Sequence, residues 1–170
     1  MSDVVQSRVE IADLVSNYCH GCDRHDEERF LSIWHPDGVW EFPPPWGAIK
    51  GREEIRTALS ELIWKGLPET HHWTTNLVVD FDEDTRDRAS GICNVYCTAT
   101  DLDGRSIHIA GTYHDTFERR DGRWGISHRN VELFWFAPAA EPWGTDLATR
   151  FQPPAVAWPP APAATAEAVK

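Results

Sequence analysis

Hydrophobic residues in the first part of the chain recur at the three- and four-residue intervals of helices with one buried face. This spacing predicts a helix over residues 5–22, and Gly21 is the type of residue that ends such a pattern. A short second helix is predicted over 27–34, because Asp26 is a good N-cap directly before it. A third helix is predicted after Gly51, where apolar residues again share one stripe.

The stretch between the second and third helices has a different pattern. Residues 35–38 (His-Pro-Asp-Gly) have the composition of a turn, and residues 39–42 resemble a short strand. Three consecutive prolines at 43–45 end that strand, because proline cannot donate a hydrogen bond to a neighbouring strand. A turn followed by one short strand is therefore predicted here.

From His71 onward the hydrophobic period changes to two, which is the period of β-strands. Asp103-Gly104 and Asp121-Gly122 interrupt this pattern, and Asp-Gly pairs supply the positive φ of tight hairpin turns. The predicted strands cover residues 71–82, 87–101, 105–119 and 123–136. Because these long strands follow a helical segment, the predicted fold class is α+β, with helices packed on a strongly bent antiparallel sheet.

The chain has 170 residues, which suffices for one domain with a hydrophobic core but not for two ordinary ones. We expect this single domain to occupy residues 1–150. Residues 151–170 are rich in proline and alanine and have no packing pattern, which predicts an extended or disordered tail.

The charge balance is acidic, with 16 Lys and Arg against 27 Asp and Glu and a net charge of −11. It argues against nucleic acid and anionic membranes as partners, because both require a basic surface. No apolar run approaches the ~20 residues of a membrane span. The N-terminus also lacks the basic start and apolar stretch of a signal peptide. We therefore expect a cytoplasmic protein.

Four cysteines, at positions 19, 22, 93 and 97, raise the question of a metal site. Cys19 and Cys22 have the spacing of a zinc or redox pair, but they end a helical pattern without the knuckle typical of zinc ribbons. Cys93 and Cys97 fall on one face of a predicted strand, as buried residues do. Buried free thiols explain these positions better than zinc, so we predict no metal and no disulfide.

Several polar residues are candidates for chemistry. Asp23 follows the first predicted helix and is either a helix-end residue paired with Arg24 or a functional carboxylate. His71 and His72 begin the first long strand on opposite faces, so spacing does not decide which one points inward. Arg129 shares a strand face with apolar residues, and a buried charge needs a partner. It is either a structural ion pair or a fixed cation in a pocket.

The sequence is rich in aromatic rings, with nine Trp and eight His. Such residues suit a pocket for a planar ligand and equally an oligomer interface. His108 and His114 share one strand face and belong either to a pocket or to a solvent-exposed row. Strand parity places Trp135 on the face of Arg129. On the opposite face it places an apolar set that predicts a subunit interface, namely Trp124, Ile126, Phe134 and Phe136.

Four motifs are specific in combination: Gly21-Cys22-Asp23-Arg24, Ser32-Ile33-Trp34, Glu69-Thr70-His71-His72-Trp73-Thr74-Thr75-Asn76-Leu77 and Glu118-Arg119-Arg120-Asp121-Gly122-Arg123-Trp124. Together they resemble the SnoaL-like branch of the nuclear transport factor 2-like superfamily, over about Val9 to Pro138. Within that branch the likeness is to the lindane dehydrochlorinases and, more distantly, to the scytalone dehydratases.

This resemblance implies a cone-shaped, barrel-like fold in which N-terminal helices pack on a strongly curved antiparallel or mixed sheet. It places the family's catalytic aspartate at Asp23, its general-base histidine at His72 and its pocket arginine at Arg129. In such a dyad the histidine takes a proton and the aspartate stabilises the imidazolium, without metal or organic cofactor. The implied reaction is a lyase elimination in a cavity between helices and sheet.

The resemblance also implies a polar substrate contact from the first helix, at Tyr18. Tyr18 occupies a position that is lysine in the dehydrochlorinases, and a tyrosine favours hydrogen bonding to a substrate oxygen over binding a halide. With the aromatic excess, this predicts a hydrophobic, aromatic small molecule that loses water or formaldehyde, with hydrogen halide as the dehydrohalogenase-like possibility. The predicted substrate-binding residues are Tyr18, Trp40, Trp73, His108 and Trp135.

Three other functions fit the same fold. An isomerase or cyclase of the ketosteroid or polyketide kind would use the aspartate as base, and a ligand-binding member would have no reaction. A dioxygenase small subunit would act structurally. The presence of both Asp23 and His72 favours the lyase. The resemblance further implies a homo-oligomer, either a trimer or a dimer.

Overall fold

The computed structural model describes residues 2–140. The predicted tail at 151–170 and the last ten residues of the predicted domain lie outside this range. No helix within residues 2–140 is long and apolar enough to cross a membrane.

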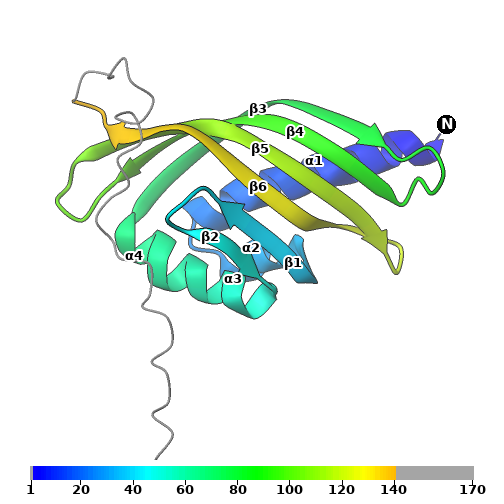
Figure 1. Ribbon diagram of the computed structural model, residues 1–170, viewed down its shortest axis with the longest axis horizontal. Helices are drawn as coiled ribbons and strands as arrows, with labels where there is room; N and C mark the ends of the chain where they lie inside the picture. The colour runs from blue at the N-terminus through cyan, green and yellow to red at the C-terminus, as the bar shows by residue number, and fades with distance from the viewer. Residues whose placement is uncertain (1, 141–170) are drawn as a thin grey trace, which may run out of the picture.

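The predicted helices are confirmed, and they gather on one side of a curved sheet (Figure 1). The long helix α1 spans Ser2–Asp23 and is followed by the short α2, Glu27–Ser32. The Asp26 carboxylate accepts the Arg29 backbone N–H at 3.0 Å, so it caps α2 as predicted. The third helix has three parts: α3 (Arg52–Ala58), the π-helical turn η1 (Leu59–Ile63) and α4 (Trp64–Gly66).

Six strands form one sheet in the order β2-β1-β6-β5-β4-β3. Their bounds are Trp34–Phe42 for β1, Gly47–Lys50 for β2, Glu69–Phe81 for β3, Arg88–Thr100 for β4, Ser106–Arg120 for β5 and Arg123–Pro138 for β6. Neighbouring strands are antiparallel except β1 and β6, which are parallel, so the sheet is mixed. The α+β class and the four long strands are therefore confirmed.

The structure differs from the sequence prediction around β1. Residues 35–38, predicted as a turn, lie inside β1, and the pairing of β1 with β6 shifts register between Trp34 and Val39. The turn-forming residues are accommodated as an irregularity within the strand. The short strand β2, which follows the three prolines, carries no alternating pattern long enough to predict it.

Two register shifts in β6 overturn the predicted division of its faces. Ser127 and Phe134 are extra residues relative to β5, because Thr116 and Phe117 pair with His128 and Ile126 and because Ala110 and Gly111 pair with Trp135 and Leu133. Each extra residue inverts the alternation of faces beyond it. Trp124, Ile126 and Phe136 are consequently buried, and of the predicted interface set Phe134 remains exposed, at 42%.

The close approach of α1 and α2 depends on Gly21, which belongs to the first of the four motifs. A Cβ atom added at Gly21 would lie 2.7 Å from the Phe30 backbone nitrogen and 2.8 Å from its Cα. Backbone atoms cannot move aside as a flexible side chain can, so glycine is required for this contact. Asp23 follows two residues later at the end of α1.

We expect Gly21→Ala to lower the free energy of unfolding by about 1–3 kcal/mol, the usual cost of overpacking. Urea unfolding followed by circular dichroism measures it. Ser16→Ala is the matched control, because Ser16 is exposed on the same helix and such substitutions change stability by at most about 0.5 kcal/mol. Equal stability of the two variants would show that α1 and α2 separate without cost.

Candidate active site

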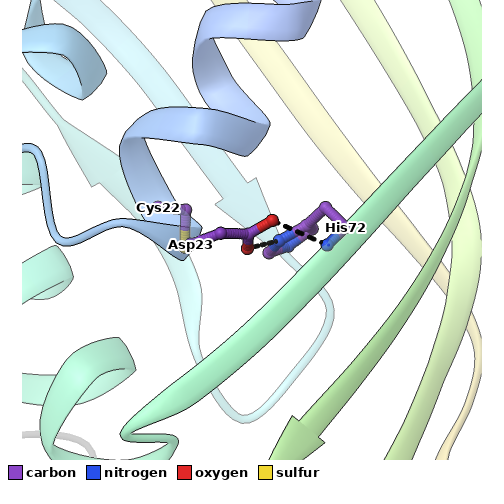
Figure 2. A group of neighbouring side chains, drawn as sticks. All are labelled: Cys22, Asp23 and His72. Atoms are coloured by element: carbon purple, nitrogen blue, oxygen red, sulfur yellow. Dashed lines mark hydrogen bonds and ion pairs between the residues drawn. The ribbon is translucent and has the colours of Figure 1, made fainter.

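Asp23 and His72 meet through two hydrogen bonds at the end of α1 (Figure 2). His72 Nδ1 lies 2.5 Å from Asp23 Oδ1, and the His72 backbone N–H donates to Asp23 Oδ2 at 2.8 Å. The Thr70 hydroxyl donates to Asp23 Oδ1, also at 2.8 Å. Thr70 and His72 are alternate residues of β3 and therefore point to the same face, so the open question of which histidine points inward is settled in favour of His72.

Both side chains of this pair are largely buried, with exposed fractions of 10% for His72 and 14% for Asp23. Burial alone would raise the pKa of Asp23, but the hydrogen bonds from His72 and Thr70, with the charge of His72 when it is protonated, outweigh burial and hold that pKa below its ordinary value. Asp23 is therefore a carboxylate at neutral pH and accepts the Nδ1 proton. This tautomer leaves a lone pair on His72 Nε2 to accept a proton.

The end of α1 is fixed from a second side by Trp64 of α4. The Trp64 indole N–H donates to the Cys22 carbonyl at 2.9 Å, and its ring stacks on His25 with centroids 4.7 Å apart. The Cys22 carbonyl belongs to the peptide that leads into Asp23, so Trp64 helps to orient the carboxylate. No sequence pattern indicates this contact, which joins residues 42 positions apart.

His72 lines a cavity between the helices and the sheet. The cavity has a volume of about 110 Å³, several times the ~10–15 Å³ that one water molecule needs. A small molecule fits this space. The wall is mostly aromatic and aliphatic and includes Trp40, Phe42, Trp46, Leu62, Val95 and Phe136. Polar groups on the wall come from His72, Tyr18, Tyr113 and Thr70 and from the thiols of Cys22 and Cys97.

Two of the predicted substrate-binding residues, Tyr18 and Trp40, line this cavity. The structure does not place the other three, Trp73, His108 and Trp135, among the described residues that line it. Trp73 is 53% exposed on the outer face of β3, and His108 is hydrogen-bonded to the Tyr96 hydroxyl at 3.1 Å.

Trp135 is displaced from the wall by the extra residue at Phe134, which turns Phe136 inward in its place. The same explanation covers why Phe136 was assigned to the wrong face. The two remaining histidines of uncertain placement also lie outside the wall: His71 is bonded to Glu69 at 3.2 Å and His114 to Glu132 at 2.9 Å.

Arg129 is fully buried behind the cavity wall rather than on it. Its Nε and Nη2 donate to the two oxygens of Asp115 at 2.8 and 2.7 Å. The guanidinium carbon lies 4.2 Å from the ring centroids of both Tyr18 and Tyr113, which face the cavity. The structural ion pair, one of the two possibilities that the sequence leaves open, is therefore present. The rings of Tyr18 and Tyr113 separate the Arg129 guanidinium from the cavity.

The two tyrosines between Arg129 and the cavity stay protonated at neutral pH. Burial raises the pKa of Tyr18, and Arg129 acts in the opposite direction without overcoming it. Burial likewise raises the pKa of Tyr113. Both phenols are therefore hydrogen-bond donors in this environment and not bases. Tyr113 was not among the predicted site residues.

One group among the described residues has ligand atoms close enough for a metal: Cys22, Asp23 and His72, within 4.8 Å of one another. Two details disfavour an ion there. Atoms that share a tetrahedral zinc with bonds near 2.0 Å are about 3.3 Å apart, whereas the bonded nitrogen and oxygen of His72 and Asp23 are 2.5 Å apart. Burial also raises the pKa of the Cys22 thiol to about 12, so it is not the thiolate that metals bind.

We expect EDTA to leave the melting temperature of the protein unchanged. Cys22→Ala should lower stability by about 1 kcal/mol through lost packing, with or without EDTA. Cys93→Ala is the matched control, because both thiols are 1% exposed and Cys93 lies outside the group. Thermal melts of the three proteins decide this. An EDTA effect on the wild type that disappears in Cys22→Ala would show that the group holds a metal.

Comparison with known proteins places the chain in a family. The model of the SnoaL-like domain matches residues 3–130. The chain belongs to the SnoaL-like domain family. It is 36% identical to hexachlorocyclohexane dehydrochlorinase 1 of Sphingobium indicum over 143 residues, which cover 82% of this chain and 91% of the relative.

Solved structures agree with this assignment. The crystal structure of LinA matches with a TM-score of 0.76 at 34% identity, over 84% of this chain and 97% of the other. The LinA-type3 dehydrochlorinase of Novosphingobium barchaimii matches with a TM-score of 0.75 at 33% identity, over 82% and 94%. A scytalone dehydratase-like protein of Novosphingobium aromaticivorans, 22% identical with a TM-score of 0.71 over 84% and 94%, shares the fold. The fold is the nuclear transport factor 2-like one expected from the sequence.

Proposed function

We propose that this protein is a lyase that removes a proton from a hydrophobic small molecule with His72 and expels a leaving group from the adjacent carbon. The observation that carries the proposal is the Asp23–His72 pair, in which Asp23 holds Nδ1 and His72 lines the cavity. The similarity to hexachlorocyclohexane dehydrochlorinases supports the same reaction class.

The elimination needs only a base and a leaving group. His72 Nε2 forms a bond to the substrate proton, and the electron pair of the broken C–H bond becomes the second bond of an alkene. The bond from the adjacent carbon to the leaving group breaks, and the leaving group departs with that electron pair. The imidazolium, stabilised by the Asp23 carboxylate, then returns its proton to water or to the leaving group.

Charge that develops on the leaving group is stabilised from the side of Tyr18. Its phenol is a donor on the cavity wall. A donor of this type suits an oxygen leaving group or a substrate oxygen. We therefore favour an oxygenated aromatic substrate that loses water.

Loss of formaldehyde is the related possibility. In that case His72 takes the proton of a substrate hydroxyl, the C–C bond breaks to leave formaldehyde, and the substrate carbon keeps the electron pair and takes the proton back. Loss of hydrogen halide, the reaction after which the relatives are named, uses the same base. We further expect a cytoplasmic homo-oligomer, a trimer or a dimer, that requires no cofactor.

A substrate panel tests the proposal. Purified protein is incubated with γ-hexachlorocyclohexane, a β-hydroxylated polyketide-type ketone and a lignin-type biaryl diol. Released chloride, the dehydrated product and formaldehyde are then measured. Release of any of these fragments supports the lyase. A product of unchanged mass would indicate an isomerase or cyclase instead, and ligand binding without any product across the panel would indicate a binding protein.

A further inference from the structure

The buried ion pair behind the cavity wall has a feature that proton abstraction does not need. Asp115 and Arg129 lie directly opposite each other on β5 and β6, and both side chains have an exposed fraction of 0%. The pair is bidentate, so the two charges cancel at close range. Burial disfavours the charged guanidinium, but Asp115 more than offsets this and keeps the pKa of Arg129 above its ordinary value.

The position of this pair makes its net charge important for any ligand. Tyr18 and Tyr113 line the cavity and contact Arg129 with their other faces, at 4.2 Å from each ring centroid. Arg129 Nη1 is buried and has no hydrogen-bond partner among the described residues. An uncompensated guanidinium at this place would attract an anion into the cavity, because charges a few Å apart interact strongly away from water.

No other positive charge competes for an anion at the wall, because none of the described lining residues is Lys or Arg. The Asp23 carboxylate is hydrogen-bonded to His72, which lines the cavity. With His72 neutral, the charges of Asp23, Asp115 and Arg129 add up to one negative charge. A ligand with its own negative charge meets net repulsion, and a neutral ligand does not.

We propose that Asp115 is a specificity-determining residue: by cancelling the charge of Arg129 it restricts the cavity to uncharged molecules. The inference deepens the proposed function, on which it rests only in taking the cavity as the substrate site, and it names the substrate class as neutral. Carboxylates and other anions of the same shape are excluded.

Binding of two nearly isosteric probes, benzamide and benzoate, tests this by calorimetry at neutral pH. For the wild type the dissociation constant of benzoate should exceed that of benzamide at least tenfold. Asp115→Asn leaves the guanidinium without its counter-charge, so benzoate should bind more tightly. The ratio of the benzoate to the benzamide dissociation constant should then fall at least tenfold. The binding measurement needs no turnover, so its outcome is independent of the lyase assay. The selectivity for neutral ligands can be observed in a protein without lyase activity, and lyase activity can be observed without this selectivity.

The double variant D115N/R129M guards against misfolding of the single variant, because it removes both buried charges together. Its ratio should stay within about threefold of the wild type, since a neutral pair is replaced by neutral residues. An unchanged ratio in a folded Asp115→Asn protein, or a larger change in the double variant, would overturn the proposal. Equal affinity of the wild type for both probes, or no binding of benzamide, would overturn it as well.

Discussion

Replacing His72 with alanine is expected to lower kcat/KM for the substrate identified from the panel by about 10²–10⁴-fold, the usual contribution of a general base. The variant keeps Asp23 and its bonds to the Thr70 hydroxyl and to the backbone N–H of residue 72, so the local structure has remaining support. What is lost is the Nε2 lone pair that accepts the proton. Steady-state kinetics at saturating and limiting substrate measure the loss.

His71→Ala is the matched control, because His71 precedes His72 on the same strand but points outward and is bonded to Glu69. It should keep activity within a factor of about two. A folded His72→Ala protein with wild-type kcat/KM would remove His72 from the mechanism, and a large loss in His71→Ala would move the chemistry to the other face of the sheet. Circular dichroism and thermal melts of both variants establish that they fold.

Hydrophobic periodicity was sufficient for the helices and the long strands, because those elements each bury one continuous face. It failed where a strand changes its alternation. Trp124 and Phe136 were assigned to the outer face by counting in twos from Arg129, and each count crosses an extra residue, Ser127 or Phe134. An extra residue leaves no mark in the sequence of its own strand, because it is defined by the pairing with the neighbouring one.

The partner of Arg129 was missed for the same reason. Counting back from the hairpin at residues 121 and 122 places Asp115 opposite His128, whereas the extra residue Ser127 moves it opposite Arg129. The sequence indicates that a buried arginine needs a counter-charge, but not which carboxylate supplies it. Tyr113 lies two residues before Asp115 on the same face of β5, and it was not identified from the sequence as a cavity residue either.

The dyad itself was indicated by resemblance to a family and not by spacing. Taken alone, Asp23 suits a helix-end residue or a surface pair with Arg24 better than a functional carboxylate. What brings it to His72 is the packing of α1 on β3, which joins residues 49 positions apart. Contacts between distant segments of this kind depend on the whole fold, so local patterns do not determine them.

Replacing Asp23 with asparagine should lower kcat/KM at neutral pH by about 10²–10⁴-fold, although the base itself is untouched. An asparagine that presents its amide N–H₂ to Nδ1 favours the tautomer with the proton on Nε2, which cannot accept a proton from the substrate. It also removes the negative charge that stabilises the imidazolium. Asp13→Asn, an exposed substitution on the same helix, is the control and should keep wild-type kinetics.

The same variant changes the pH dependence of stability in a defined direction. The folded state holds the pKa of Asp23 below its ordinary value of 3.8, so the unfolded chain binds the proton more readily. The ionised carboxylate therefore stabilises the fold above that ordinary value, and this contribution is lost as the pH falls through the lowered pKa. Urea unfolding between about pH 3 and 7 should show the wild type losing stability on acidification more steeply than Asp23→Asn. Parallel profiles would show that the His72 bond does not favour the ionised carboxylate, and the assignment of the dyad would then fail on electrostatic grounds.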